Sequence, residues 1–132
     1  ENGLDCRIVP ASDPVGEGTY NAAEFTPALI KDGEKIEDSF WTGEQPRACF
    51  GTGDQGVYML IIEGRYPDEG IRGTSVNTCS DILLAYGCRN ALNMDGGSSA
   101  ILWYDGEYVT QSSSSFLRYT GGRPLPNAWV YG

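Results

Sequence analysis

The chain of 132 residues has the length of one domain, and with 40% hydrophobic and 20% charged residues it is too apolar to be disordered. Its formal net charge of −9 disfavours nucleic acids and anionic membranes as partners. The longest strongly apolar run, Val57–Ile62, is far shorter than the roughly 20 residues of a membrane-spanning helix.

The first elements predicted along the chain are an irregular arm and two hairpins. Prolines and glycines interrupt residues 1–25, and the core domain is assigned to residues 26–132. In the core, an Asp-Gly turn separates two strand-like runs, Ala28–Ile30 and Glu34–Ile36. A second hairpin joins Arg47–Gly51 to Gly56–Glu63, whose apolar second arm we expect to be a central strand covered on both faces.

The second half of the core carries one helical pattern. Apolar side chains recur at three- and four-residue steps over Ser75–Tyr86, with Ser75 or Asn77 available to cap the start and Gly87 to end the helix. Further strands are predicted at Asn90–Met94, at Ser99–Tyr104 with Tyr108–Thr110, and at Asn127–Tyr131. This order indicates an α+β fold, a mixed and mainly antiparallel sheet of short strands and hairpins with one principal helix packed on it.

Four cysteines, Cys6, Cys49, Cys79 and Cys88, permit three disulfide pairings. The chain has no histidine and no Cys-x-x-Cys pair, which makes a zinc site improbable. An even cysteine count in a small glycine-rich chain favours an oxidising compartment and hence a secreted protein; four buried free thiols in a cytosolic protein are the alternative. Pairing Cys79 with Cys88 and Cys6 with Cys49 is one guess at the connectivity.

The segment Asn93–Ser99, Asn-Met-Asp-Gly-Gly-Ser-Ser, is the most informative for function. It lies between two hydrophobic runs, so Asp95 should sit at a strand end, beside N–H groups that Gly96 and Gly97 can expose to an anion. Ordinary turns are built from the same residues, and Asp95 with neighbouring hydroxyls and carbonyls could instead hold a divalent cation. No other cofactor is expected.

The segment resembles the hallmark of the phosphodiester glycosidase family, a hydrophobic strand ending in Asn-Leu-Asp-Gly-Gly-Gly-Ser. Four further stretches match that family in the same order, and the resemblance spans about Thr26 to Gly132. They are Thr26–Gly33, Pro46–Gly51, Ile61–Arg65 and Gly122–Ala128. The resemblance implies a glycoside hydrolase that cleaves the bond between a sugar and phosphate, with a sugar phosphodiester or phosphoglycan as substrate.

The resemblance and the chemistry together give each residue a predicted role. Breaking an anomeric C–O bond to phosphate builds positive charge on the sugar and negative charge on the phosphate, which suits carboxylates and arginines respectively. We expect Asp95 and Glu63 to be the catalytic carboxylates, although a structural ion pair is an alternative for Glu63. The residues predicted to bind substrate are Arg47, Arg65, Asn93, Gly96, Gly97, Ser98, Ser99 and Arg123. Trp41, Trp103 and Trp129 could stack on sugar rings, although large aromatic residues more often belong to the core.

Three features favour a second function. Glu63 replaces the family's usual Asp and Ser98 replaces its third Gly, and a further N-terminal portion typical of the family is not found in this sequence. A missing segment or a partner chain could supply that portion. The alternative function is therefore a non-catalytic module that binds carbohydrate or phosphate, or a structural domain, with the same fold.

Overall fold

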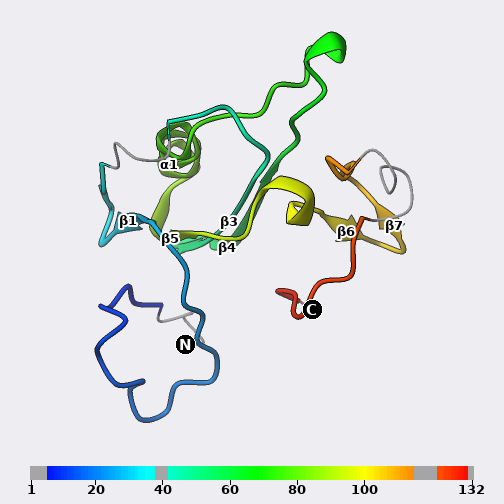
Figure 1. The fold of residues 1–132 in the computed structure, drawn as a ribbon. Coiled ribbons are helices and arrows are strands. Elements are labelled where there is room, and N and C mark those ends of the chain that lie inside the picture. Colours follow the sequence, from blue (N-terminus) through cyan, green and yellow to red (C-terminus); the bar gives the residue numbers. More distant parts are fainter. Residues whose placement is uncertain (1–5, 38–41, 115–121, 131–132) are drawn as a thin grey trace.

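A computed structural model of the protein describes residues 6–37, 42–114 and 122–130. A five-stranded sheet in the order β2-β1-β5-β3-β4 forms the body of the fold, and the helix α1 (Val76–Ala85) lies on one face of it (Figure 1). The five strands are β1 (Ala28–Lys31), β2 (Glu34–Lys35), β3 (Arg47–Gly53), β4 (Gly56–Ile62) and β5 (Cys88–Asn93). All pairs in the sheet are antiparallel, so the predicted α+β class with one principal helix is confirmed.

A separate two-stranded ribbon of β6 (Trp103–Tyr104) and β7 (Glu107–Tyr108) follows the sheet. Its turn contains Asp105 and Gly106, both at positive φ, as the Asp-Gly signal predicts. Short 3-10 turns occupy Pro67–Glu69 and Gly97–Ser99. In the described part of the chain, no helix has the length and apolar character needed to cross a membrane.

The core lies between α1 and the sheet. Buried apolar side chains from β1, β3, β5 and α1 form one cluster, with partly buried side chains of β4 packed against it. The cluster consists of Leu29, Ile30, Cys49, Val76, Cys79, Leu83, Cys88 and Ala91. Directly opposed residues of an antiparallel pair point to the same face, so the pairing of Cys49 with Asn93 and with Leu60 places all three side chains on the helix-covered face.

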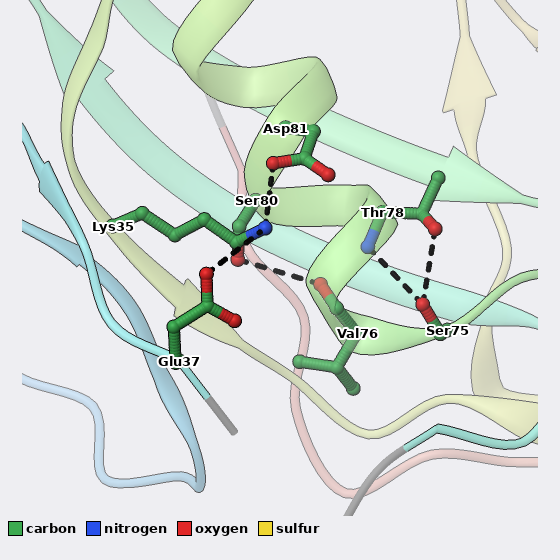
Figure 2. A network of polar contacts seen from close by, with 7 residues as sticks. All are labelled: Lys35, Glu37, Ser75, Val76, Thr78, Ser80 and Asp81. Atoms are coloured by element: carbon green, nitrogen blue, oxygen red, sulfur yellow. Dashed lines mark hydrogen bonds and ion pairs between the residues drawn. The ribbon is translucent and has the colours of Figure 1, made fainter. Parts of the chain in front are cut away.

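Polar contacts fix both the start of α1 and its position over β2 (Figure 2). Ser75 caps the helix, because its Oγ accepts a hydrogen bond from the Thr78 amide at 3.2 Å. From β2, the Lys35 ammonium reaches Asp81 on the helix at 2.6 Å and Glu37 at 3.6 Å. The hydrogen bond to Asp81 is the main cause that raises the pKa of Lys35. These contacts hold the first hairpin against the helix.

Two of the predictions about strands are wrong. Within the described residues β4 is an edge strand, not a central one, because β3 is its sheet neighbour and the sheet order ends there. The strand is apolar because both of its faces are partly covered by other residues. Coverage of the faces does not determine whether a second strand pairs with its other edge. The strand predicted at Asn127–Tyr131 is also absent from residues 127–130, and Tyr131 lies outside the described residues.

Candidate active site

The sheet topology brings the ends of two strands to one place. Because β4 and β5 are both antiparallel to β3, they run in the same direction, and their C-terminal ends lie where β3 begins. Glu63 and Arg65 follow β4, and the Asp95–Gly97 loop follows β5. Residues that are far apart in the sequence therefore meet at one end of the sheet.

Two backbone hydrogen bonds seat the Asp95 loop on the start of β3. The Met94 amide donates to the Ala48 carbonyl at 2.8 Å, and the Gly97 amide donates to the Pro46 carbonyl at 3.0 Å. A Cβ on Gly96 would lie 2.5 Å from the Pro46 carbonyl oxygen, so only glycine allows this close approach. The loop is thus held rigidly on both sides of Asp95.

The Asp95 carboxylate and the Arg123 guanidinium form an ion pair at 3.2 Å. The same Arg123 nitrogen donates to the Ser99 hydroxyl at 2.6 Å, and Ser99 itself is buried. The side chains of Arg123 and Asp95 are 50% and 60% exposed, respectively, so both groups are open to a ligand from solvent. A buried serine thus orients an exposed arginine beside an exposed carboxylate.

Arg65 approaches the same loop from the end of β4. Its Nε donates to the Gln45 side chain at 2.9 Å, which orients the guanidinium. A Cβ on Gly97 would lie 3.2 Å from both Nη atoms of Arg65, so the guanidinium packs against the backbone of the loop. Arg65 and Arg123 therefore both contact the Asp95–Ser99 segment, which gives this end of the acidic protein a local concentration of positive charge.

Glu63 lies in this region and has a backbone partner. Its carboxylate accepts a hydrogen bond from the Gln111 amide. The adjacent Ser112 is buried, its carbonyl accepts from the Tyr66 hydroxyl at 2.7 Å, and its own hydroxyl donates to the Ser98 carbonyl at 3.3 Å. Glu63 thus anchors the polar segment that follows the β6–β7 ribbon. The Ser98 carbonyl holds the same segment through Ser112.

Arg47 and Asn93 are buried, in contrast to the exposed Asp95 and Arg123. Arg47 donates from Nε to the Thr74 carbonyl at 3.0 Å and from Nη2 to the Gly43 carbonyl at 2.7 Å. Burial is the main cause that lowers the pKa of Arg47. The Asn93 amide nitrogen donates to the Thr26 carbonyl at 2.8 Å, and its Oδ1 is buried without a hydrogen-bond partner among the described residues. Direct substrate binding by Arg47 and Asn93 stays a prediction.

The tryptophans occupy different environments. Trp129 stacks on Phe50 of β3, with ring centroids 4.3 Å apart. Trp103 is 60% exposed on the ribbon, and Trp41 lies outside the described residues.

The sequence did not identify Gln45, Tyr66 and Gln111 as residues of this region. Nothing in a polar loop residue shows which distant group it will bind.

A metal site is not evident in this region. Within residues 6–37, 42–114 and 122–130, no group of three or more His, Cys, Asp or Glu side chains is arranged to hold a metal ion. The divalent cation considered for Asp95 therefore has no supporting cluster in the described structure. The charged group that does contact Asp95 is the Arg123 guanidinium.

The fold and the site define an α+β domain with an acidic loop contacted by two arginines at one end of its sheet. The chain matches the phosphodiester glycosidase family over residues 5–131 and belongs to that family. The resemblance in the motifs is confirmed, and the match extends into the N-terminal arm. The proposed boundary at residue 26 stays a prediction.

Two relatives show how much of a longer protein this chain corresponds to. It is 26% identical over 118 residues to the SPbeta prophage-derived uncharacterized protein YomE of Bacillus subtilis (strain 168), covering 85% of this chain and 18% of that protein. It is also similar to a solved structure, a hypothetical protein from Synechocystis, with a TM-score of 0.54 and 27% identity. That likeness covers 67% of this chain and 18% of the other. The chain thus spans less than a fifth of either relative.

Proposed function

We propose that this domain hydrolyses the glycosidic bond of a sugar-1-phosphodiester, releasing the free sugar and a phosphomonoester. The observation that supports this most directly is the exposed Asp95 carboxylate held beside Arg123, with Arg65 packed on the same loop. Membership of the phosphodiester glycosidase family supports the general reaction class. The sugar and the group beyond the phosphate are not specified by these observations.

The reaction places opposite charges on the two sides of the bond that breaks. The anomeric carbon gains positive charge as its bond to the phosphate oxygen lengthens, and that oxygen takes the electron pair. In the proposal Asp95 faces the anomeric carbon, as a nucleophile or as the base that takes a proton from the attacking water. Arg123 and Arg65 bind the phosphate, which leaves as a phosphomonoester whose additional negative charge they stabilise.

The two carboxylates receive different roles. Asp95 is exposed and has a side-chain partner that a phosphate can attract away, so it is assigned to the reacting centre. Glu63 accepts from a backbone amide and anchors the segment at Gln111, so it is assigned to positioning. Arg47 donates to two backbone carbonyls, so in this proposal it has a structural role and does not contact phosphate.

The test is hydrolysis of UDP-N-acetylglucosamine and of simple sugar-1-phosphate diesters, with Asp95→Asn as the variant. Free sugar should be released by the unmodified protein, and turnover should fall by about 10²–10⁴-fold in the variant. Asp32→Asn is a matched control, because Asp32 is also an exposed loop carboxylate but lies in the β1–β2 turn.

Binding without turnover would favour the second function, a non-catalytic module for carbohydrate or phosphate. The openness of the site supports this alternative, because Asp95 and Arg123 are both at least half exposed. Isothermal titration with the same sugar phosphates distinguishes the two functions. Saturable binding that is weakened by Arg123→Met, with no sugar released by the unmodified protein, would replace the hydrolase proposal.

A further inference from the structure

Two buried cysteines face each other across the interface between the helix and the sheet. Cys49 lies in β3 and is 4% exposed, whereas Cys79 lies on α1 and is fully buried. Both belong to the core cluster, and each thiol is the main influence on the pKa of the other. All four cysteines are within the described residues, and the structure holds each as a free thiol.

The surroundings make the two thiols chemically unequal. The neighbouring Cys49 thiol lowers the pKa of Cys79, and the positive charge of Arg47 lowers it further against the effect of burial. The neighbouring Cys79 thiol, together with burial, raises the pKa of Cys49. In the folded protein the two thiols therefore influence each other directly.

We propose that Cys49 and Cys79 are a disulfide-forming pair that cross-links β3 to α1 when the protein folds in an oxidising compartment. The proposal rests on the shared place of the two cysteines in the core, supported by their mutual influence, and it is independent of the proposed hydrolase activity. It selects one of the three possible pairings. The pairing predicted from the sequence, Cys6 with Cys49 and Cys79 with Cys88, differs from the one proposed here.

The oxidant required is a disulfide, such as oxidised glutathione or an oxidised dithiol protein. The thiolate of one cysteine of the pair attacks one sulfur of that disulfide, forming a mixed disulfide and releasing the first thiol of the oxidant. The other cysteine of the pair, after loss of its proton, then attacks the sulfur of the first cysteine and releases the second thiol. The two cysteines lose two protons and two electrons, and the oxidant is reduced to two thiols.

Burial determines when this exchange can occur. Because both sulfurs are inaccessible in the folded protein, an oxidant reaches them before α1 packs on the sheet or when the helix transiently opens. The resulting link would fix α1 to the strand on which the Gly96–Gly97 loop is seated through Pro46 and Ala48. It would therefore stabilise the support of the candidate site without changing any group that faces a ligand.

The pairing can be determined by peptide mapping of the Cys6→Ser variant, which leaves three cysteines and three possible single links. The reduced protein is refolded in a mixture of reduced and oxidised glutathione, alkylated, and digested without reduction. Trypsin alone leaves Cys79 and Cys88 on one peptide, between Arg72 and Arg89, so chymotrypsin is added to cut between them at Leu83, Leu84 or Tyr86. Mass spectrometry should then show Cys49 linked to Cys79, with Cys88 alkylated.

Two results of the mapping would overturn the proposal. One is a link from either Cys49 or Cys79 to Cys88. The other is recovery of both Cys49 and Cys79 in the alkylated form from protein that has refolded under oxidising conditions.

A stability measurement tests the same link without peptide mapping. The apparent melting temperature of the oxidised protein should exceed that of the reduced protein by about 10 °C, because the link restricts the unfolded chain. Cys6→Ser should retain this difference and Cys49→Ser should lose it. Since the comparison is made between oxidised and reduced forms of the same variant, a lower overall stability of Cys49→Ser does not obscure the result. Persistence of the full difference in Cys49→Ser would contradict the proposal.

Discussion

The Arg65 guanidinium packs against the backbone of Gly97, where a side chain would meet both of its Nη atoms at 3.2 Å. Gly97 also has a φ of 56°, in the region that favours glycine. One residue thus combines two requirements: a left-handed backbone at the turn after Asp95 and space for an arginine beside that turn. The two requirements can be separated by mutation.

Gly97→Ala is expected to lower the stability by about 1 kcal/mol, because alanine is strained at positive φ. It should also displace the Arg65 guanidinium, whose end is mobile enough to give way, and raise KM for a sugar phosphodiester several-fold. Gly106→Ala is the matched control, since Gly106 has a φ of 89° and a Cβ added there would meet no atom within 4 Å. Urea denaturation and steady-state kinetics should show similar destabilisation in both variants and a change of KM only in Gly97→Ala. An equal change of KM in the two variants would show that the contact with Arg65 does not matter for substrate.

Local signals in the sequence were sufficient for the hairpins and the helix. The Asp-Gly pairs at Asp32 and Asp105 occur in turns at positive φ, and the three- and four-residue spacing from Val76 onward corresponds to α1. Ser75 was one of two candidate caps, and its hydroxyl makes the capping contact. These features are local, because each depends on backbone conformation within a few residues.

Features that depend on distant partners could not be predicted in this way. Arg47 lies in a motif that suggests a phosphate ligand, yet it donates to carbonyls of Gly43 and Thr74, the second of which is far away in the sequence. Likewise, the apolar run of β4 does not reveal that the strand lies at an edge of the sheet. The meeting of Asp95, Arg65 and Arg123 follows from sheet order and from the course of the C-terminal segment, which no local pattern encodes.

Arg123 is expected to matter for activity much more than for folding. Arg123→Met removes the ion pair with Asp95 and the hydrogen bond to Ser99, and the loss of an exposed ion pair costs only about 0–1 kcal/mol of stability. In the proposed mechanism it also removes a group that stabilises the leaving phosphate, so kcat/KM should fall by about 10²-fold or more. Lys35→Met removes another ion pair, that with Asp81, on the hairpin next to α1. Its kcat/KM should be unchanged, and an equally small effect of Arg123→Met would exclude Arg123 from the site.

Glu63 is expected to act by positioning the Gln111 segment. Glu63→Gln keeps an oxygen that can accept from the Gln111 amide, so both stability and kcat should remain within a few-fold of the unmodified protein. Glu63→Ala removes the carboxylate that accepts from that amide and should cost about 1–3 kcal/mol, with a larger loss of kcat. Rescue by glutamine is the decisive readout. If kcat of Glu63→Gln fell by about 10²-fold or more at normal stability, Glu63 would be a second catalytic carboxylate.

Trp129 is expected to hold the C-terminal segment on the sheet and thereby to place Arg123. Its ring stacks on Phe50 at 4.3 Å with an interplanar angle of 15°, and such a contact contributes about 1 kcal/mol beyond the area that it buries. Trp129→Ala should therefore destabilise the protein and also raise KM, because the segment that carries Arg123 loses its attachment to β3. Trp103→Ala is the control for stability, since Trp103 is 60% exposed on the ribbon. Combining Trp129→Ala with Arg123→Met tests whether Trp129 affects substrate binding through Arg123. If it does, the double variant should have the same KM as Arg123→Met alone. Additive effects on KM would show that Trp129 affects substrate by another route.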